Sequence, residues 1–259
     1  MRRTLGTLTC AIALAFGVMQ AQATPASADG GGPGAVPIPA AELQRAAAKT
    51  QQLNALISRD TITQDYGEVI MSLWQEIQQA YAAKWCGPGA TEAIVGQWRG
   101  NAMIDNYSGP EGLGPDAYQR RLAQTLGEYD TTLQMTTWSG FTTTTNNEAL
   151  TGGFYVSGPV GGFTNYTDRL YGDIQIYGHP LAPVVDAAGL PGWGPAQHVS
   201  HFVTVKQYWI GGDTTTYGDT ASISQGRNSA ASWNIVPLNS FYSVHIQPIN
   251  MFSSDQIVW

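Results

Sequence analysis

The spacing of hydrophobic side chains changes along the chain. Up to about residue 130, apolar side chains recur every three or four positions, and this spacing predicts helices. Beyond Gly152, short apolar runs lie between Gly and Pro residues, which is typical of strands joined by turns. Helices first and strands later, without regular alternation, predict an α+β fold with a helical N-terminal part and an antiparallel β-sheet C-terminal part.

The pattern also predicts individual elements. Helical spacing covers residues 40–59, 69–81, 90–98 and 116–129. The clearest strands are expected at 201–210 and 241–246. The Thr-rich residues 131–145 are expected to form a loop or an extended stretch, and residues 169–176 fit either a helix or an edge strand.

The N-terminus has the pattern of an export signal. Two arginines precede a mostly apolar run from Leu5 to Met19, and Ala21-Gln22-Ala23 matches the small-x-small rule of a cleavage site. We therefore expect residues 1–23 to be a signal peptide, and the mature protein to be secreted (extracellular or cell-envelope) with no membrane attachment. Residues 24–39, rich in Gly, Pro and Ala, are expected to form a flexible linker.

Charge and known short motifs exclude several classes of ligand. The formal net charge is −7, only 12% of the residues are charged, and Lys and Arg are not clustered, which argues against nucleic acid and anionic membranes. The chain contains no HExxH or CxxC metal motif and no P-loop. We expect no metal and no cofactor. The oligomeric state is left open.

Cys86 is the most informative residue of the chain. The only other cysteine, Cys10, lies in the predicted signal peptide, so the mature protein has a single thiol that cannot form an intrachain disulfide. Cys86 stands where a loop ends and a helix begins, with Pro88 suited to the first helical turn. A thiol at a helix N-terminus faces unpaired N–H groups, which favour the nucleophilic thiolate.

A nucleophilic thiol needs a base and a residue that orients the base. His201 opens the clearest predicted strand, directly after a loop rich in Gly and Pro. Asp219 follows 18 residues later, a spacing that suits the next strand of a hairpin. For the oxyanion, the Cys86 N–H is one candidate donor, and Gln79 or Gln78 is a candidate second donor or a helix surface residue.

The sequence Lys84-Trp85-Cys86-Gly87-Pro88-Gly89-Ala90-Thr91 resembles the Cys-Gly-Pro-Ala signature of the bacteriocin-processing (double-glycine) peptidases and their stand-alone secreted relatives. The His-aromatic-Val strand at 201–205 and the later turn at 217–219 are similar to that family, and the likeness spans roughly residues 78–259. It implies a papain-like cysteine peptidase domain over 78–259, preceded by a helical region at 40–77. It also implies that Cys86 is the nucleophile, His201 the base and Asp219 the orienting residue, with Gln79 or Gln78 as oxyanion donor. The sequence has Gly89 where the family usually has Ala.

The resemblance predicts a peptide or protein substrate, cleaved through a thioester acyl-enzyme. The alternative is a catalytically silent exported binding module on the same scaffold, for a cell-wall or protein partner. Transfer of the acyl group to an amine, in place of water, is also open. A serine hydrolase is disfavoured because the sequence has no G-x-S-x-G motif. Residues 24–59 could serve as a propeptide, a spacer or part of the fold.

Overall fold

A computed structural model describes residues 38–59, 65–74, 85–127, 136–196, 198–221, 233–247 and 256–259, and every structural statement below concerns these residues. The predicted signal peptide and nearly all of the predicted linker lie outside them, and so do Gln78 and Gln79.

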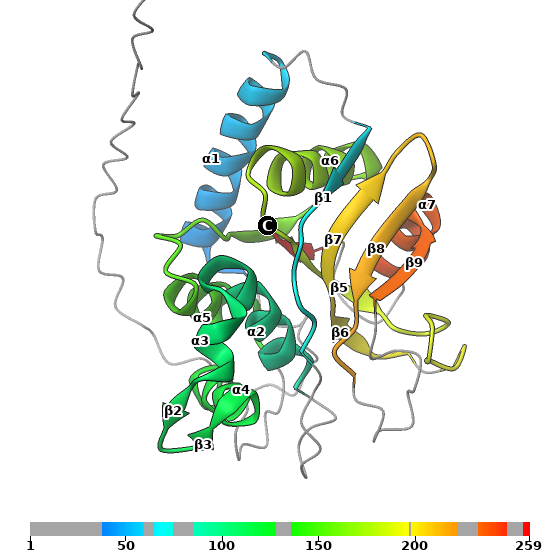
Figure 1. Cartoon of the computed structure of the whole chain (residues 1–259). Helices are drawn as coiled ribbons and strands as arrows, with labels where there is room; N and C mark the ends of the chain where they lie inside the picture. Colours follow the sequence, from blue (N-terminus) through cyan, green and yellow to red (C-terminus); the bar gives the residue numbers. More distant parts are fainter. Residues whose placement is uncertain are drawn as a thin grey trace, which may run out of the picture. The chain divides into compact units, whose positions relative to one another are not determined.

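Helices dominate the first part of the described chain, and strands become more frequent toward its end (Figure 1). The α-helices are α1 (Ala40–Ile57), α2 (Cys86–Arg99), α3 (Asn101–Asp105), α4 (Gly114–Thr125), α5 (Trp138–Glu148), α6 (Phe163–Leu170) and α7 (Leu238–Ser240), with π-helical turns η2 (Tyr171–Ile176) and η4 (Phe241–Ile246). The strands are β1 (Tyr66–Glu68), β2 (Ser108–Gly109), β3 (Gly112–Leu113), β4 (Ser157–Pro159), β5 (Ala182–Asp186), β6 (Ser200–Phe202), β7 (Thr204–Trp209), β8 (Thr214–Gly218), β9 (Trp233–Pro237) and β10 (Gln256–Val258).

The strands form two four-stranded antiparallel sheets and one short hairpin. The first sheet has the order β1-β7-β8-β9, and these strands lie side by side in Figure 1. The second has the order β4-β10-β5-β6, and β2 pairs with β3. Only Val203 separates β6 from β7, so the chain passes from one sheet to the other at this residue. The mixed architecture with antiparallel sheets confirms the α+β class.

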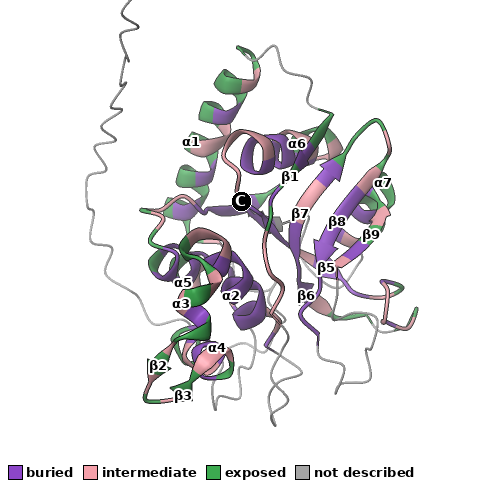
Figure 2. Ribbon diagram, viewed as in Figure 1, coloured by how far each residue is buried: buried purple, intermediate pink, exposed green. Residues whose placement is uncertain are grey.

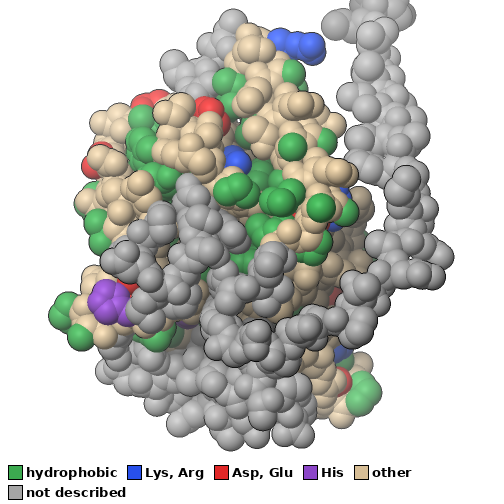
Figure 3. All heavy atoms as spheres, turned by 180° about the vertical axis from the view of Figure 1, so that it is seen from behind, with side chains coloured by type: hydrophobic (Ala, Val, Ile, Leu, Met, Phe, Trp, Pro, Cys, Tyr) green, Lys and Arg blue, Asp and Glu red, His purple; other side chains and the backbone are tan. Residues whose placement is uncertain are grey.

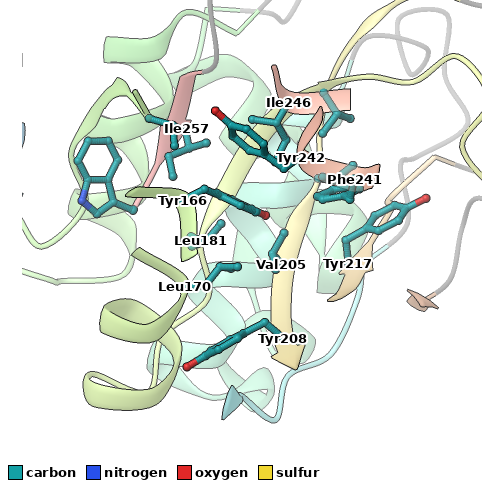
Figure 4. Close-up of a cluster of buried hydrophobic side chains, with 14 of the residues drawn as sticks. Tyr166, Leu170, Leu181, Val205, Tyr208, Tyr217, Phe241, Tyr242, Ile246 and Ile257 are labelled. Carbon is teal, nitrogen blue, oxygen red and sulfur yellow. The ribbon is translucent and has the colours of Figure 1, made fainter. Parts of the chain in front are cut away.

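The largest hydrophobic core lies between the two sheets, the helix α6 and the π-helical turns η2 and η4. Figure 4 shows its buried tyrosines among aliphatic side chains. The rings of Tyr166 and Tyr242 stack with centroids 5.4 Å apart, and Tyr217 stacks on Phe241 at 4.9 Å. Because large aromatic rings bury much apolar area, this cluster fixes η4 against the first sheet.

A second core holds α2 and α5 against β6. Phe202 of β6 stacks on Phe141 of α5 with centroids 4.4 Å apart and meets Trp138 edge-on. Ala90 and Ile94 of α2 belong to the same buried cluster. The residue before Phe202 is His201, so this packing fixes the position of that histidine relative to α2.

Helix α1 packs against the part of the chain that follows the predicted domain boundary at residue 78. Glu42 accepts a hydrogen bond from the buried N–H of Ser157 at 2.8 Å, and Lys49 pairs with the buried carboxylate of Asp173 at 3.1 Å. Buried charged groups are costly unless each has a partner, and both of these have one. Residues 40–57 are therefore part of the fold.

Three sequence predictions of secondary structure were wrong. The helix expected from residue 69 does not form over residues 69–74, which have no regular secondary structure and continue from the strand Tyr66–Glu68. The backbone groups here pair with β7, including a hydrogen bond from the Val69 N–H to the Lys206 carbonyl at 2.8 Å, and burial alternates with period two. Residues 75–81 lie outside the described chain.

The other two corrections concern a loop and a strand. Part of the Thr-rich stretch is helix α5, whose N-terminus is capped by Thr137 Oγ1 accepting from the Gly140 N–H at 3.0 Å. Residues 241–246 form the π-helical turn η4 and not a strand. Tyr242 and Ile246 are buried while Val244 between them is exposed, so the apolar spacing is four and not two.

We expect Leu53→Ala to lower the free energy of unfolding by about 2–5 kcal/mol, because Leu53 of α1 is fully buried against Gly172. Urea unfolding would measure this change. The matched control is Leu43→Ala on the same helix, which is 41% exposed and should change stability by less than about 0.5 kcal/mol. Equal, small effects of both substitutions would show that α1 contributes little to the fold.

Candidate active site

The thiol of Cys86 lies at the first turn of α2. Trp85, the residue before the helix, is fully buried, and its carbonyl accepts a hydrogen bond from the Gly89 N–H at 3.0 Å. The first N–H groups of a helix have no acceptor within the helix, and Pro88 has no N–H. The N–H groups of Cys86 and Gly87 thus remain beside the thiol at the positive end of the helix dipole. This position stabilises negative charge on the sulfur or on a nearby oxygen.

Two glycines let α2 approach its neighbours closely. A Cβ atom on Gly89 would lie 2.7 Å from Thr220 Oγ1, and one on Gly87 would overlap the side chain of Thr136. Both distances are shorter than atoms in proteins tolerate, so a side chain at either position would displace its threonine. This close packing explains why position 89 is a glycine here, although the double-glycine peptidases usually have Ala at the matching position. The contact brings the end of β8 against the first turn of α2.

His201 and Asp219 come from segments joined by the β7–β8 hairpin. Thr204 pairs with Gly218 at the last position of the β7–β8 register, and the two site residues lie just beyond this pair. His201 Nε2 and Asp219 Oδ1 are 2.7 Å apart, and both side chains are buried. The spacing noted in the sequence therefore corresponds to a direct contact.

Asp219 has two further donors. The Ala221 N–H donates to Oδ1 at 2.8 Å, and the indole Nε1–H of Trp193 donates to Oδ2 at 2.8 Å. The Trp193 ring also packs against the His201 ring with centroids 4.9 Å apart. Trp193 thus fixes the carboxylate and covers the imidazole. The sequence alone assigned no role to Trp193. The only feature that could have pointed to it is its place in the Gly- and Pro-rich loop before His201.

The paired groups shift each other's pKa in opposite directions. Burial lowers the pKa of His201, but the charge and hydrogen bond of Asp219, with a smaller contribution from Cys86, outweigh burial and raise this pKa well above its ordinary value. Burial raises the pKa of Asp219, but His201 and the hydrogen bonds from Ala221 and Trp193 lower it below its ordinary value overall. Both effects favour an imidazolium facing a carboxylate.

Cys86 is the third member of the group. Its half-buried side chain lies close enough to the His201 ring for a hydrogen bond and charge from Cys86 to help raise the pKa of His201. Since His201 Nε2 faces Asp219, Nδ1 is the ring nitrogen left for the sulfur. The structure therefore brings Cys86, His201 and Asp219 together in the order thiol, imidazole, carboxylate. Gln79 and Gln78, the candidate oxyanion donors, lie outside the described residues.

The other three histidines lie elsewhere. His198, with its side chain 45% exposed, pairs with Asp186 at 2.7 Å, and His245 Nδ1 lies 2.9 Å from the Asp186 carbonyl oxygen. His179 stacks on Trp98 with centroids 3.6 Å apart. Within the described part of the chain, no group of three or more His, Cys, Asp and Glu residues is arranged to hold a metal ion.

Comparison of the chain with protein-family models, with curated proteins and with solved structures found no match in any of the three. None of the helices that the structure describes combines the length and hydrophobicity that a membrane span requires. Figure 3 shows charged side chains scattered singly over one face of the described residues, without a basic patch.

The stability that the His201–Asp219 pair provides should depend on pH. His201 has a raised pKa in the folded protein, so its contribution is complete below the ordinary value of 6.5 and is lost as the pH rises through the raised pKa. Asp219 has a lowered pKa, so its contribution is lost only as the pH falls through that lowered value. We expect the difference in unfolding free energy between the native chain and His201→Gln to shrink as the pH rises above 6.5. Urea unfolding over a pH series would measure it, and a constant difference would contradict the assignment.

We expect Trp193→Phe to destabilise the protein by about 1–3 kcal/mol, because one buried oxygen of Asp219 loses its donor. The loss of this hydrogen bond should raise the pKa of Asp219, so acid unfolding should begin at a higher pH than in the native chain. The control is Trp138→Phe, which removes a buried indole N–H that has no acceptor among the described residues. An unchanged acid transition in Trp193→Phe would contradict the role of this donor.

Proposed function

We propose that this chain is a secreted cysteine peptidase that hydrolyses peptide bonds through Cys86, His201 and Asp219. The observation that carries the proposal is the continuous contact from a half-buried thiol, through a buried imidazole, to a buried carboxylate. The N-terminal pattern of an export signal supports secretion, and the site itself requires no metal or cofactor for this chemistry.

The burial of the His201–Asp219 pair supports a catalytic role over a purely structural one. Two charged groups lose their hydration when they are buried, and well-packed apolar side chains usually stabilise a core at least as well. Pairs with strongly shifted pKa values are instead typical of catalytic sites. Here the shifted pair also touches the only thiol in the described residues, which lies at a helix N-terminus.

The His201 imidazolium carries the proton that Cys86 has given up, so in the first half of the reaction the Cys86 thiolate attacks the carbonyl carbon of the scissile bond. The C–S bond forms while the carbonyl electron pair moves onto oxygen. When this intermediate collapses, the C–N bond breaks and His201 returns the proton to the leaving amine. The products of this step are a free amine and a thioester on Cys86.

In the second half, a water molecule replaces the amine. His201 takes a proton from the water, whose oxygen attacks the thioester carbon and breaks the C–S bond. The sulfur leaves as the thiolate while His201 keeps the proton from the water, which restores the starting pair, and the product leaves as a carboxylic acid that ionises in water. Throughout, Asp219 holds Nε2 of His201, so that Nδ1 stays directed at the sulfur.

Negative charge on the carbonyl oxygen requires hydrogen-bond donors in both halves. The N–H groups of Cys86 and Gly87 are unpaired within α2 and lie beside the sulfur, so they suit this role. Gln79 or Gln78 would supply a side-chain donor, as the resemblance to the double-glycine peptidases implies. An α+β fold with the cysteine at a helix start and the histidine in an antiparallel sheet is what a papain-like scaffold requires, and we propose that scaffold for residues 78–259.

The experiment that tests this proposal compares Cys86→Ala and His201→Ala with a histidine control. Each of the two substitutions should lower kcat for hydrolysis of a peptide library by about 10³-fold or more. His198→Ala removes a histidine three positions away that pairs with Asp186, and it should leave kcat within about twofold of the native value. Cleavage would be measured by mass spectrometry of the products.

Unchanged cleavage by Cys86→Ala would contradict the proposal of a cysteine peptidase. A native chain that cleaves no peptide of the library and whose Cys86 does not react with iodoacetamide would favour the binding module. Capture of the acyl group by an added amine, in preference to water, would instead assign the chain to transpeptidation through the same thioester.

A further inference from the structure

The sheet β1-β7-β8-β9 has a face that points away from the core. On β7 and β8 the inner face carries Tyr208 and Tyr217, which are fully buried. On the outer face, Tyr66 of β1 lies directly opposite Trp209 of β7, and these side chains are 45% and 47% exposed. Figure 2 shows the exposed positions of β1 at this edge of the sheet. Two adjacent aromatic rings are thus presented to solvent by a rigid sheet.

The ring of Trp209 is held in one orientation. Its Nε1–H donates to Asp65 Oδ2 at 3.1 Å, and the other oxygen of Asp65 accepts from the Gly211 N–H at 2.6 Å. One side of the ring rests on Gly212, where a Cβ atom would overlap it. An exposed indole that is fixed by its neighbours loses little conformational entropy on binding a ligand.

Polar side chains continue the outer face beside the aromatic pair. Thr216 Oγ1 donates to Gln207 Oε1 at 2.6 Å, Gln207 Nε2 donates to the Tyr66 hydroxyl at 3.0 Å, and that hydroxyl donates to Glu68 Oε2 at 2.7 Å. The register shifts between Val205 and Gln207, and this β-bulge turns Lys206 to the same face. Thr216 is buried and orients Gln207, so the accessible part of the row is the Gln207 amide, the Tyr66 hydroxyl and the Glu68 carboxylate.

The opposite end of the face carries another aromatic ring. Lys206 Nζ lies 4.8 Å from the ring centre of Trp233, the first residue of β9. Trp233 is four residues along the strands from the Trp209 row and two strands away, a separation on the order of 16 Å. Ile235, 70% exposed, lies between the two ends. A ligand that touches both ends is longer than one sugar or one amino acid.

The charges of this face offset each other. Glu68 and Lys206 lie on it 3.4 Å apart, and at its edge Asp65 is hydrogen-bonded to Trp209 and Gly211. The whole chain carries a net charge of −7, which repels polyanions. The complementary ligand is therefore uncharged, extended, and able to contact aromatic rings and polar groups at once.

We propose that this outer face binds a neutral oligosaccharide chain. The C–H faces of pyranose rings pack on exposed aromatic rings, and sugar hydroxyls pair with amide, hydroxyl and carboxylate groups of the kind aligned on Gln207, Tyr66 and Glu68. This site is separate from Cys86 and does not depend on the peptidase proposal. On a secreted peptidase it would hold the enzyme at a glycan surface where its protein substrates lie.

The test is isothermal titration of the full chain with cellohexaose, N-acetylchitohexaose and glucose. At least one hexasaccharide should bind, and glucose should not, because a monosaccharide reaches only one end of the face. Trp209→Ala should weaken the binding by about tenfold or more. Tyr66→Phe keeps the ring but removes the central hydroxyl of the hydrogen-bonded row, and it should give a smaller, measurable loss.

Leu113→Ala, which truncates a 78% exposed side chain on the separate β2–β3 hairpin, is the control and should bind as the native chain does. Thermal unfolding would verify that each variant is folded, and peptide cleavage by Trp209→Ala should be unchanged. The proposal is overturned if neither hexasaccharide binds, or if Trp209→Ala and Tyr66→Phe both bind with native affinity. Concentration-dependent self-association that Trp209→Ala abolishes would also overturn it, since the face would then belong to a second copy of the chain.

Discussion

The close contact between the first turn of α2 and the end of β8 is the constraint on which the candidate site depends. Helix and sheet can meet here because Gly89 leaves room for the side chain of Thr220. The thiol is fixed to this turn of the helix and the carboxylate to the residue before Thr220. A larger side chain at position 89 would push the two elements apart and separate the thiol from the carboxylate without changing either group.

The histidine reaches the same point from the second sheet. β6 belongs to one sheet and β7 to the other, with Val203 alone between them, so His201 and Asp219 meet where the two sheets join. Phe202 anchors this junction by stacking on Phe141 of α5. The thiol, imidazole and carboxylate therefore come from three elements whose relative positions are set by core packing, as the proposed catalytic role would require.

The sequence predicted secondary structure correctly where the local preference of a segment agrees with its packing in the fold. The helix that follows Cys86 and the β7–β8 hairpin follow from apolar spacing and turn residues, and hence the candidate thiol, base and acid could be named. The strand β1 could not be predicted, because its three residues Tyr66–Glu68 are too few to show an apolar pattern and only pairing with β7 makes them a strand. The role of Trp193 depends on a loop that folds back over the site, and no periodicity in the sequence reports such a contact.

Strand β10 lies between β4 and β5 in the second sheet, although about a hundred residues separate it from β4 along the chain. Closing so long a loop has a high entropic cost and is typically a late event in folding. During synthesis, β4 and β5 leave the ribosome well before residues 256–258 can insert between them. The sheet that carries His201 is thus completed only after residues 256–258 have been made, which delays the final packing around the His201–Asp219 pair.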